Sequence, residues 1–227
     1  MPRTFRLIAT LIALAALLAL AGCFARTTGP KPVPDAAPSA NSPPGAVRRF
    51  AYCWQNRDED RYSALFAQNY VLVPAVGDSS GNSAPHPWSR DDELLATSHM
   101  FVGDLTHTAA VKITLEFDRT LIALSDPRPG HANRWHHSIR THVDLNVVID
   151  HGDGSSETKQ IQGFALFYLV RGDSAQIPPA LTARGFKPDS TRWYIDRMED
   201  ETLPSGGGLH ALPSKTTTWF SVLMSYL

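Results

Sequence analysis

The chain has 227 residues, of which 43% are hydrophobic and 19% charged, and its 21 Lys and Arg nearly balance its 22 Asp and Glu. This length suits one domain with a substantial core. The net charge of −1 and the absence of any basic run longer than two residues argue against a nucleic-acid partner and against electrostatic binding to a membrane.

Residues 1–22 have the features of a secretory signal peptide. Arg3 and Arg6 give it a positive start, and residues 7–20 form an apolar run in which Thr10 is the only polar residue. The run is shorter than the roughly 20 residues of a membrane-spanning helix, so we expect a signal rather than a span. Its removal takes away two arginines and no acid, which leaves a net charge of about −3.

The end of this segment, Leu20-Ala21-Gly22-Cys23, resembles a bacterial lipobox. The resemblance implies cleavage before Cys23, diacylglycerol on its thiol and a further acyl chain on the new amine. Several acyl chains together give stable membrane anchoring. Phe24 is not the aspartate that the enterobacterial sorting rule associates with inner-membrane retention, which favours the outer membrane, facing the periplasm. The alternative is a simple cleaved signal followed by an incidental cysteine.

Residues 23–44 are expected to form a lipidated, proline-rich tether. Their prolines, set among Ala, Ser, Thr and Gly, keep such a chain extended and unable to bury a core. If Cys23 is lipidated, Cys53 has no intrachain partner, and we expect it to be a small buried hydrophobe. The folded domain is expected at 45–200, followed by a flexible C-terminal tail, 201–227, that contains a short apolar segment.

Helical periodicity characterises the start of the folded part. Apolar residues recur at helical spacing over 47–54, and Asp58 can cap a second helix that runs through Gln68. A short strand is predicted at 70–73, followed by a loop to Trp88. Ser89 and Asp92 resemble a capping box, which predicts a third helix. Four of its residues are expected on one side, with His99 at the border of that side: Leu94, Leu95, Ser98 and Val102.

Strand periodicity follows. Residues 111–117 alternate between apolar and polar, and this strand is expected to continue to Ala123 past a bend. The centre of the fold is a long hairpin, His137 to Arg171. Its first arm alternates, its return arm is apolar at nearly every position, and residues 150–154 between them suit a tight reversal.

Three further segments complete the prediction. The loop 172–190 contains Ile177, Leu181 and Phe186, which we expect to pack down on the domain. A last long strand is predicted at 191–199. The apolar stretch 218–227 is predicted to form one short helix that docks on the domain or on a neighbouring molecule.

The opening of the folded part resembles the nuclear-transport-factor-two-like superfamily, which includes SnoaL-like and ketosteroid isomerase-like proteins. The similar residues are Arg49 to Asp60, then Tyr62, the Ala-Leu-Phe-Ala of 64–67 and the strand at 70–73. The resemblance implies an α+β fold of cystatin-like, SnoaL-like topology. In it a cone-shaped, curved antiparallel sheet wraps around three N-terminal helices and encloses an apolar pocket. We expect six residues to line this pocket: Phe50, Trp54, Phe66, His99, Phe167 and Trp193.

The catalytic pattern of ketosteroid isomerase-like proteins is missing at the matching positions. The family's tyrosine falls on Phe50, which cannot donate a hydrogen bond, and its aspartate falls on Pro74, which cannot take a proton. Weaker catalytic candidates are His99, His137 and one of Asp196 or Arg197, which could meet in the cone if the apolar side of the hairpin faces inward. A hydrogen-bonded histidine at the rim is the commoner situation.

Several classes of site have no support in the sequence. His131, His136, His137 and His142 invite a metal interpretation, but on a strand His137 points away from its neighbour and no carboxylate or cysteine completes a ligand set. There is no Gly-rich phosphate loop, nucleophile elbow or zinc-finger spacing. We therefore expect no cofactor and no metal.

Two hypotheses of function follow. The first is a non-catalytic module that holds a small hydrophobic ligand in the cone or forms a homodimer through the sheet face of Arg140, His142, Asp144 and Asn146. The rival is a SnoaL-like enzyme of isomerase, cyclase or hydratase type, using histidine and aspartate as general acid and base. A third hypothesis is a structural role, with the cone filled by its own side chains. In each case the protein would be a lipid-anchored protein of the cell envelope.

Overall fold

A computed structural model describes residues 36–76, 78, 87–131, 134–172, 176–185, 187–189, 191–203 and 217–227. The chain divides into two units, Met1–Ala36 and Ala37–Leu227, and the second contains every helix and strand described below. The predicted signal, Cys23 and most of the tether lie outside the described residues. Among the described residues, no helix is long and apolar enough to cross a membrane.

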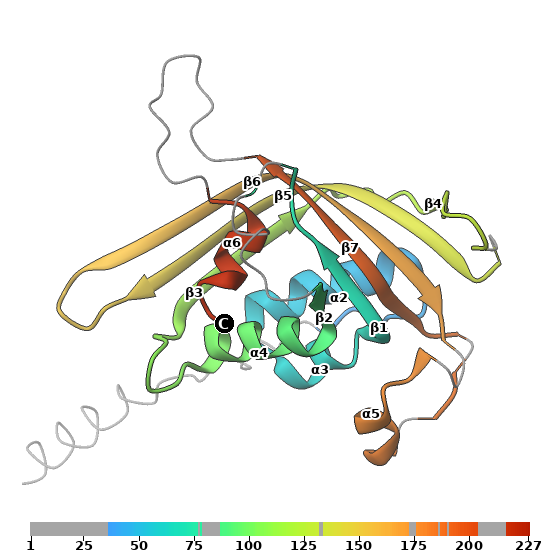
Figure 1. The fold of residues 1–227 in the computed structure, drawn as a ribbon, viewed down its shortest axis with the longest axis horizontal. Coiled ribbons are helices and arrows are strands. Elements are labelled where there is room, and N and C mark those ends of the chain that lie inside the picture. Colours follow the sequence, from blue (N-terminus) through green and yellow to red (C-terminus); the bar gives the residue numbers. More distant parts are fainter. Residues whose placement is uncertain are drawn as a thin grey trace, which may run out of the picture. The chain divides into compact units, whose positions relative to one another are not determined.

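The second unit is a mixed α+β structure built on one open, curved, seven-stranded sheet (Figure 1). The strand order is β2-β1-β7-β6-β5-β3, and β4 pairs with β5. All pairs are antiparallel except β1 with β7, which is parallel and departs from the expected antiparallel sheet. The strands are β1 Phe66–Val73, β2 Trp88–Ser89, β3 Ala110–Phe117, β4 Leu124–Ser125, β5 His136–Asp150, β6 Ser156–Arg171 and β7 Trp193–Leu203.

The predicted hairpin is confirmed as β5 and β6, which pair from His136↔Val170 to Asp150↔Ser156. Gly152 and Gly154 have φ angles of 75° and 87° in the reversal, a conformation that side chains with a Cβ rarely adopt. The alternation of the first arm is also confirmed, because its odd-numbered residues from Ile139 to Ile149 are buried.

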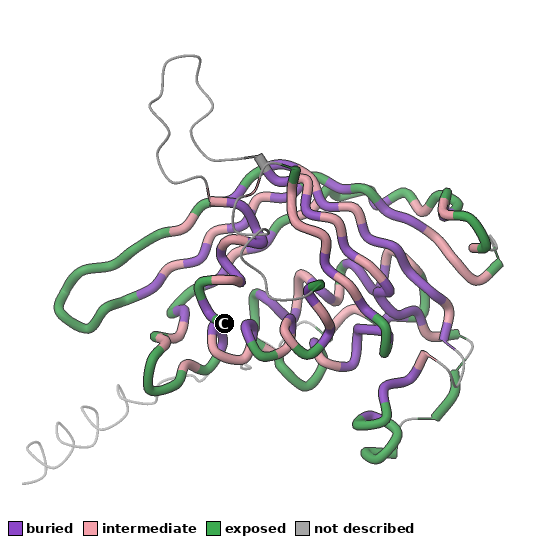
Figure 2. The backbone as a smooth tube through the Cα atoms, viewed as in Figure 1, coloured by how far each residue is buried: buried purple, intermediate pink, exposed green. Residues whose placement is uncertain are grey.

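The helices lie along the concave face of the sheet, which we call the inner face (Figure 1). They are α2 Pro43–Asn56, α3 Glu59–Ser63, α4 Arg90–Val102 and the C-terminal α6 Trp219–Met224. The short α5, Pro179–Ala183, lies near the starts of β1 and β7 (Figure 1). Burial follows this arrangement, with buried residues alternating along the strands and gathered where the helices face the sheet (Figure 2).

The second helix is shorter than predicted. The sequence pattern favoured a helix through Gln68, but α3 ends at Ser63 and β1 begins at Phe66. The cause is tertiary, because β1 pairs with β7 and the backbone N–H of Ile195 donates to the carbonyl of Leu65 at 2.8 Å. Such pairing overrides the local helical periodicity.

The buried side of α4 also differs from the prediction. Leu95 is 47% exposed and Val102 65% exposed, whereas the buried residues are Arg90, Glu93, Ala96, Thr97, Met100 and Phe101. The predicted side did not include Glu93 and Thr97, which are polar. They are buried because each has a hydrogen-bond partner inside the protein.

Three other segments can be compared with the prediction. The strand expected to continue to Ala123 ends at Phe117, and β4 is a separate short strand. The last long strand extends to Leu203 rather than residue 199. The loop 172–190 does pack down, since Ile177 and Leu181 are buried in a small cluster with Ala64, Ala67, Val170 and Tyr194, while Phe186 lies outside the described residues.

Candidate functional site

The inner face of the sheet is filled by aromatic side chains. Five of the residues expected to line a pocket are buried in one hydrophobic core: Phe50, Trp54, Phe66, Phe167 and Trp193. The rings contact one another, with centroids 5.3 Å apart for Phe50 and Phe167 and 6.3 Å apart for Phe50 and Phe66. Cys53 is a free, buried cysteine, as predicted, and burial raises the pKa of its thiol to about 12.

The C-terminal helix α6 is part of this core. The ring of Trp219 lies 4.9 Å from that of Trp54 and 5.7 Å from that of Phe50, and the ring of Phe220 lies 5.0 Å from that of Trp88. The prediction of a short docking helix is therefore confirmed, and the helix docks on its own domain.

The end of β7 holds the first turn of α6. Asp200 accepts a hydrogen bond from the backbone N–H of Phe220 at 2.9 Å, and the Thr202 hydroxyl accepts one from that of Trp219 at 3.0 Å. Thr218 and Ser221 form a capping box at the same turn. These partners satisfy backbone donors that a helix start otherwise leaves unpaired, so the helix can be buried at low cost.

One carboxyl group, that of Glu93, is wholly buried among these rings. It accepts hydrogen bonds from the Tyr62 hydroxyl at 2.5 Å and from Trp88 Nε1 at 3.0 Å. Burial raises the pKa of Glu93 to about 7, although these two hydrogen bonds act in the opposite direction. Burial also raises the pKa of Tyr62 and of Tyr70 well above the ordinary value, and the nearby Glu93 adds to both shifts.

The sequence analysis missed Glu93, although the sequence contains a signal for it. Ala96, Met100 and Phe101 follow Glu93 at i+3, i+7 and i+8, which places all four on one helical stripe. An acid on an apolar stripe indicates a buried, hydrogen-bonded carboxyl group.

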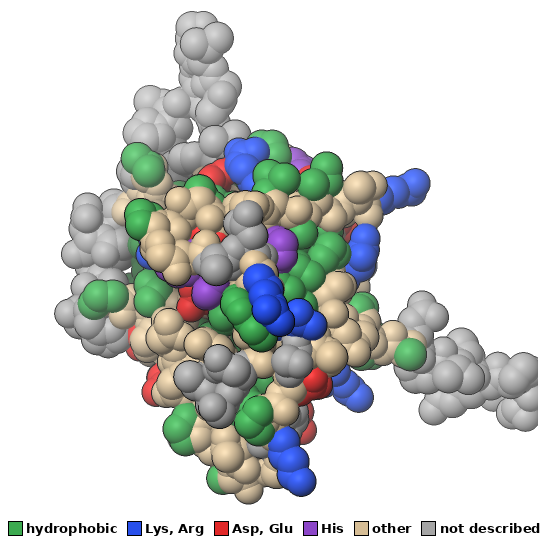
Figure 3. Space-filling model, turned by 90° about the vertical axis from the view of Figure 1, so that its right-hand side faces the viewer, with side chains coloured by type: hydrophobic (Ala, Val, Ile, Leu, Met, Phe, Trp, Pro, Cys, Tyr) green, Lys and Arg blue, Asp and Glu red, His purple; other side chains and the backbone are tan. Residues whose placement is uncertain are grey.

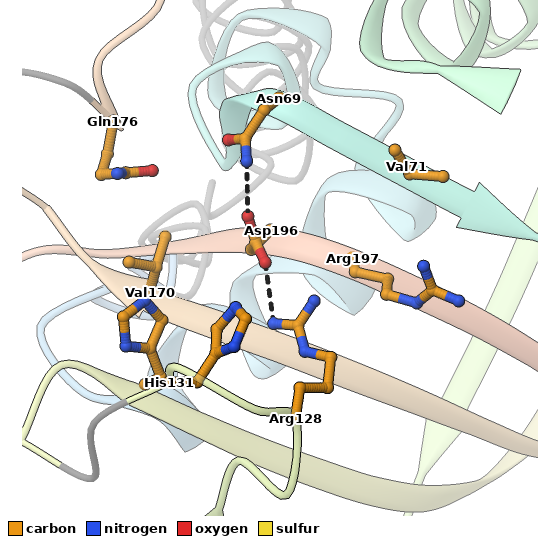
Figure 4. Close-up of a pocket in the computed structure, with 9 residues that line it drawn as sticks. Asn69, Val71, Arg128, His131, Val170, Gln176, Asp196 and Arg197 are labelled. Atoms are coloured by element: carbon orange, nitrogen blue, oxygen red, sulfur yellow. Dashed lines mark hydrogen bonds and ion pairs between the residues drawn. The ribbon is translucent and has the colours of Figure 1, made fainter. Parts of the chain in front are cut away.

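A second polar site is a pocket of about 280 Å³ on the opposite, outer face of the sheet (Figure 4). We call it the outer pocket. Asp196 lies at its centre and accepts hydrogen bonds from Asn69 Nδ2 at 3.1 Å and from Arg128 Nη2 at 2.8 Å. The pocket is lined by Asn69, Val71, Arg128, His131, His136, Val170, Gln176, Asp196 and Arg197.

A β-bulge directs Asp196 into this pocket. Along β7, Ile195 and Arg197 are partners of consecutive residues of β6, Leu169 and Tyr168, so Asp196 is the extra residue. Because of the bulge, Asp196 and Arg197 both line the outer pocket, although they are neighbours on a strand. This corrects the expectation that one of them faces inward with the apolar side of the hairpin.

Arg128 connects the pocket to a buried acid behind it. Its Nε and Nη2 both donate to the Asp126 carboxylate, at 2.7 to 3.1 Å. Burial raises the pKa of Asp126, but the hydrogen bonds from Arg128 outweigh burial and leave that pKa below its usual value. Asp126 is therefore a fixed negative charge that holds the Arg128 guanidinium in place.

Two histidines stand beside Arg128. The rings of His131 and His136 meet edge to face with centroids 4.7 Å apart, and the buried Nδ1 of His136 has no hydrogen-bond partner among the described residues. Seen from the end of the unit that carries β4 and α5, histidine and basic side chains gather beside a hydrophobic patch (Figure 3).

The catalytic candidates from the sequence occupy separate places. His137 points its Nδ1 at the carbonyl of Leu124, 3.1 Å away, and its ring lies 5.1 Å from that of Trp193. Asp196 is in the outer pocket. His99, on α4, contacts Asp104 and the carbonyl of Tyr226. No hydrogen bond or ion pair between described residues connects any two of these three candidates. His99, Asp104 and His107 form a group that could hold a metal ion.

Comparisons with known proteins found neither a matching family model nor a matching curated protein. Among solved structures, the chain is similar to a nuclear-transport-factor-two-like superfamily protein from Salmonella enterica, with 14% identity, a TM-score of 0.42, and coverage of 72% of this chain and 89% of that one. It is also similar to a ketosteroid isomerase-like protein from Erwinia carotovora, with 10% identity, a TM-score of 0.39, and coverage of 69% and 89%. A third is a hexachlorocyclohexane dehydrochlorinase, with 9% identity, a TM-score of 0.41, and coverage of 74% and 90%.

Proposed function

We propose that this chain is a lipid-anchored protein of the bacterial cell envelope whose SnoaL-like domain is a non-catalytic binding module. The observation that carries this proposal is the filling of the inner face by α6, whose Trp219 and Phe220 stand against Phe50, Trp54 and Trp88. The space in which a cone-shaped domain would hold a substrate is occupied by the protein's own side chains.

The outer pocket is the binding site in this proposal. Each oxygen of Asp196 already accepts one hydrogen bond, from Asn69 or from Arg128. The lining also contains Arg128, Arg197 and two histidines, which can donate to a ligand. Arginine donors suit a carboxylate, and Val71 and Val170 offer an apolar contact beside them. The ligand class is a small molecule or a partner side chain that carries a carboxylate.

Two arginines on the outer face permit a matched test. Arg197 lines the pocket and pairs with Glu199 at 2.7 Å, whereas Arg140 lies outside it and pairs with Glu201 at 2.6 Å. With succinate as the probe and imidazole chemical shifts as the signal, Arg197→Met should weaken binding about tenfold, the value of one charge-assisted hydrogen bond. Arg140→Met should leave the dissociation constant unchanged. An absence of succinate binding to the wild-type protein would contradict the proposed ligand class.

The anchor is tested separately, at Cys23. Cys23→Ser removes the thiol that would carry diacylglycerol, so the protein should leave the membrane fraction and appear in the periplasmic extract. If the membrane fraction is unchanged, the anchor is refuted while the binding proposal still stands. Native mass spectrometry of the released protein would count its copies, and so test the homodimer expected through the sheet face.

An enzyme of SnoaL-like type is the alternative function, and Glu93 is the observation that favours it. A carboxyl group with a pKa near 7 that is hydrogen-bonded to a tyrosine has the properties of a general acid or base. To act on a substrate it would need α6 to leave the inner face. Hydrogen exchange of the α6 amides discriminates between the two functions. Exchange only through global unfolding supports the binding module, and exchange through a much cheaper local opening supports the enzyme.

A further inference from the structure

Three side chains with metal-ligating atoms meet where α4 ends. His99 Nε2 lies 3.1 Å from one oxygen of Asp104, and His107 Nδ1 lies 3.1 Å from the same oxygen. One ligand atom from each residue can be chosen so that all of them lie within 4.8 Å of one another. The rings of His99 and His107 are stacked, with centroids 4.8 Å apart and planes 12° apart, so both imidazoles flank the carboxylate.

The backbone brings these residues together through a turn at Gly103. Its φ of 80° is strained for residues with a Cβ, and a Cβ there would lie 3.0 Å from the backbone nitrogen of Ala109. The turn returns the chain against the last turn of α4. Asp104 Oδ1 then accepts from the backbone N–H groups of Thr106 and His107, at 2.6 and 2.7 Å, which fixes the carboxylate before any ligand arrives.

The second nitrogen of His99 supplies an observation outside the cluster. His99 Nδ1 lies 2.7 Å from the backbone carbonyl oxygen of Tyr226, and a carbonyl can only accept, so Nδ1 carries the proton. The other ring nitrogen, Nε2, faces Asp104 at 3.1 Å. Metal-ligating histidines are oriented in this way, with the distal nitrogen donating to a carbonyl or carboxylate.

We propose that His99, Asp104 and His107 bind a divalent transition-metal ion, with zinc the best match. Two imidazole nitrogens and one carboxylate oxygen form a ligand set typical of zinc with an open position. The 3.1 Å separations between ligand atoms are close to the roughly 3.3 Å expected for two ligands at a tetrahedral zinc ion. The side chains are 21%, 33% and 22% exposed, so the ion can enter from solvent and keep a water ligand.

The site would secure the C-terminal segment that fills the inner face. Tyr226 follows α6, is buried, and is held by His99 through its carbonyl and by the Thr108 carbonyl through its hydroxyl at 3.3 Å. A metal ion that fixes the His99 ring strengthens the contact between α4 and the last residues of the chain. Metal binding and docking of α6 are therefore coupled, because the ion binds the docked state more tightly than the undocked state.

The test uses the full-length protein in detergent with Co²⁺ and Zn²⁺ as probes. Co²⁺ should give the visible absorption of a low-symmetry, nitrogen-containing site, and Zn²⁺ should displace it. At a hundredfold excess over its dissociation constant, Zn²⁺ should raise Tm by about 5 °C. It should also slow amide exchange at residues 219–227 more than in the β5–β6 hairpin.

Asp104→Asn is the informative variant because an amide oxygen can still accept from Thr106 and His107, so the turn should persist. We expect it to weaken Zn²⁺ binding at least about a hundredfold, beyond the range for loss of an outer-shell contact. His107→Ala should do the same. The control is His151→Ala, at an exposed histidine in the β5–β6 turn, and it should bind Zn²⁺ like the wild-type protein.

Two results would overturn the proposal. One is the absence of stoichiometric Co²⁺ or Zn²⁺ binding to the wild-type protein. The other is binding that His151→Ala weakens as much as Asp104→Asn does, which would mean adventitious coordination by surface histidines. If the ion binds as expected but leaves exchange at 219–227 unchanged, the coupling to α6 is refuted.

Discussion

Polar side chains have contrasting environments on the inner and outer faces of the sheet. On the inner face, Glu93 is buried among aromatic rings and is held by two neutral donors, Tyr62 and Trp88. On the outer face, Asp196 sits in an open pocket and is paired with the positive charge of Arg128. Burial in the first environment raises the pKa of Glu93 and so favours its uncharged form.

Under the proposed function, this difference separates stability from recognition. The inner face gains stability from burial, and α6 adds Trp219, Phe220, Val222 and Leu223 to its core. The outer face keeps charged groups in an open pocket, where the proposed ligand would meet them. If the two faces differ in this way, substitutions on the inner face should mainly change the free energy of unfolding, and substitutions on the outer face should mainly change ligand binding.

The largest effect is expected from Trp219→Ala, which removes the ring that α6 places against Phe50 and Trp54. Truncation of a buried tryptophan leaves a cavity and costs about 4 kcal/mol of the free energy of unfolding. Urea denaturation measures the loss. The variant should also bind a small apolar dye that the wild-type protein excludes, because the inner face would regain an open space.

The matched control is Leu227→Ala, four residues past the helix's Leu223 and 41% exposed. It should change the free energy of unfolding by less than about 0.5 kcal/mol. A loss from Trp219→Ala no larger than that from Leu227→Ala would mean that α6 does not fill the inner face in solution.

The second effect is a dependence of stability on pH that comes from Glu93. Its pKa is about 7 in the folded protein against a usual 4.5, so the folded state binds more protons than the unfolded state between these values. Stability from this group is therefore present below pH 4.5 and is lost as the pH rises to about 7. The loss is about 3 kcal/mol.

Glu93→Gln isolates this contribution because glutamine keeps an acceptor for Tyr62 and Trp88 but does not titrate in this range. The difference in free energy of unfolding between wild type and variant, measured by urea denaturation from pH 4.5 to 8, should move in favour of the variant as the pH rises. Parallel curves for the two proteins would show that Glu93 stays ionised, and that the inner face is wetter than its packing indicates.

The sequence predicted regular features of both faces and missed those that depend on contacts between distant segments. Alternation along 139–149 placed the inner face of β5 correctly, and the docking helix at the end of the chain was predicted from its apolar run. The parallel pairing of β1 with β7 left no local trace. A pattern read over the 58–68 stretch could not detect that Ile195 pairs with Leu65.

The site residues show the same limit. The periodicity of α4 contained the signal for Glu93, but the predicted side was chosen from Leu94, Leu95, Ser98 and Val102, and a buried acid with hydrogen-bond donors was not considered. Asp196 was named, yet its direction was not predictable, because an extra residue in β7 places both Asp196 and Arg197 on the outer side and breaks the alternation of the strand. His107 was not named because its closeness to His99 depends on a reversal at Gly103.

A smaller effect is expected from Asp196→Asn on the outer face. The change removes a negative charge that pairs with Arg128 at 2.8 Å, while an amide can still accept from Asn69 or Arg128. The cost should be about 1 to 2 kcal/mol, because one charge-assisted hydrogen bond in a partly open site becomes a weaker one. Binding of succinate should tighten, since the anion in the pocket that competes for Arg128 is gone. If succinate binding weakens instead, the Asp196 carboxylate is needed to hold Arg128 in place for the ligand and does not compete with it.

The smallest effect is expected from His137→Ala, which tests whether a histidine beside the inner core takes part in chemistry. Its ring contacts Trp193, and its Nδ1 meets the Leu124 carbonyl near the surface, where water can replace it. Its removal should lower the free energy of unfolding by less than about 1 kcal/mol. Urea denaturation and the succinate titration, run beside His151→Ala as the exposed reference, should show both variants close to wild type. A loss comparable with that from Trp219→Ala would place His137 in the inner core, and the division between a filled inner face and a proposed binding site on the outer face would then fail at β5.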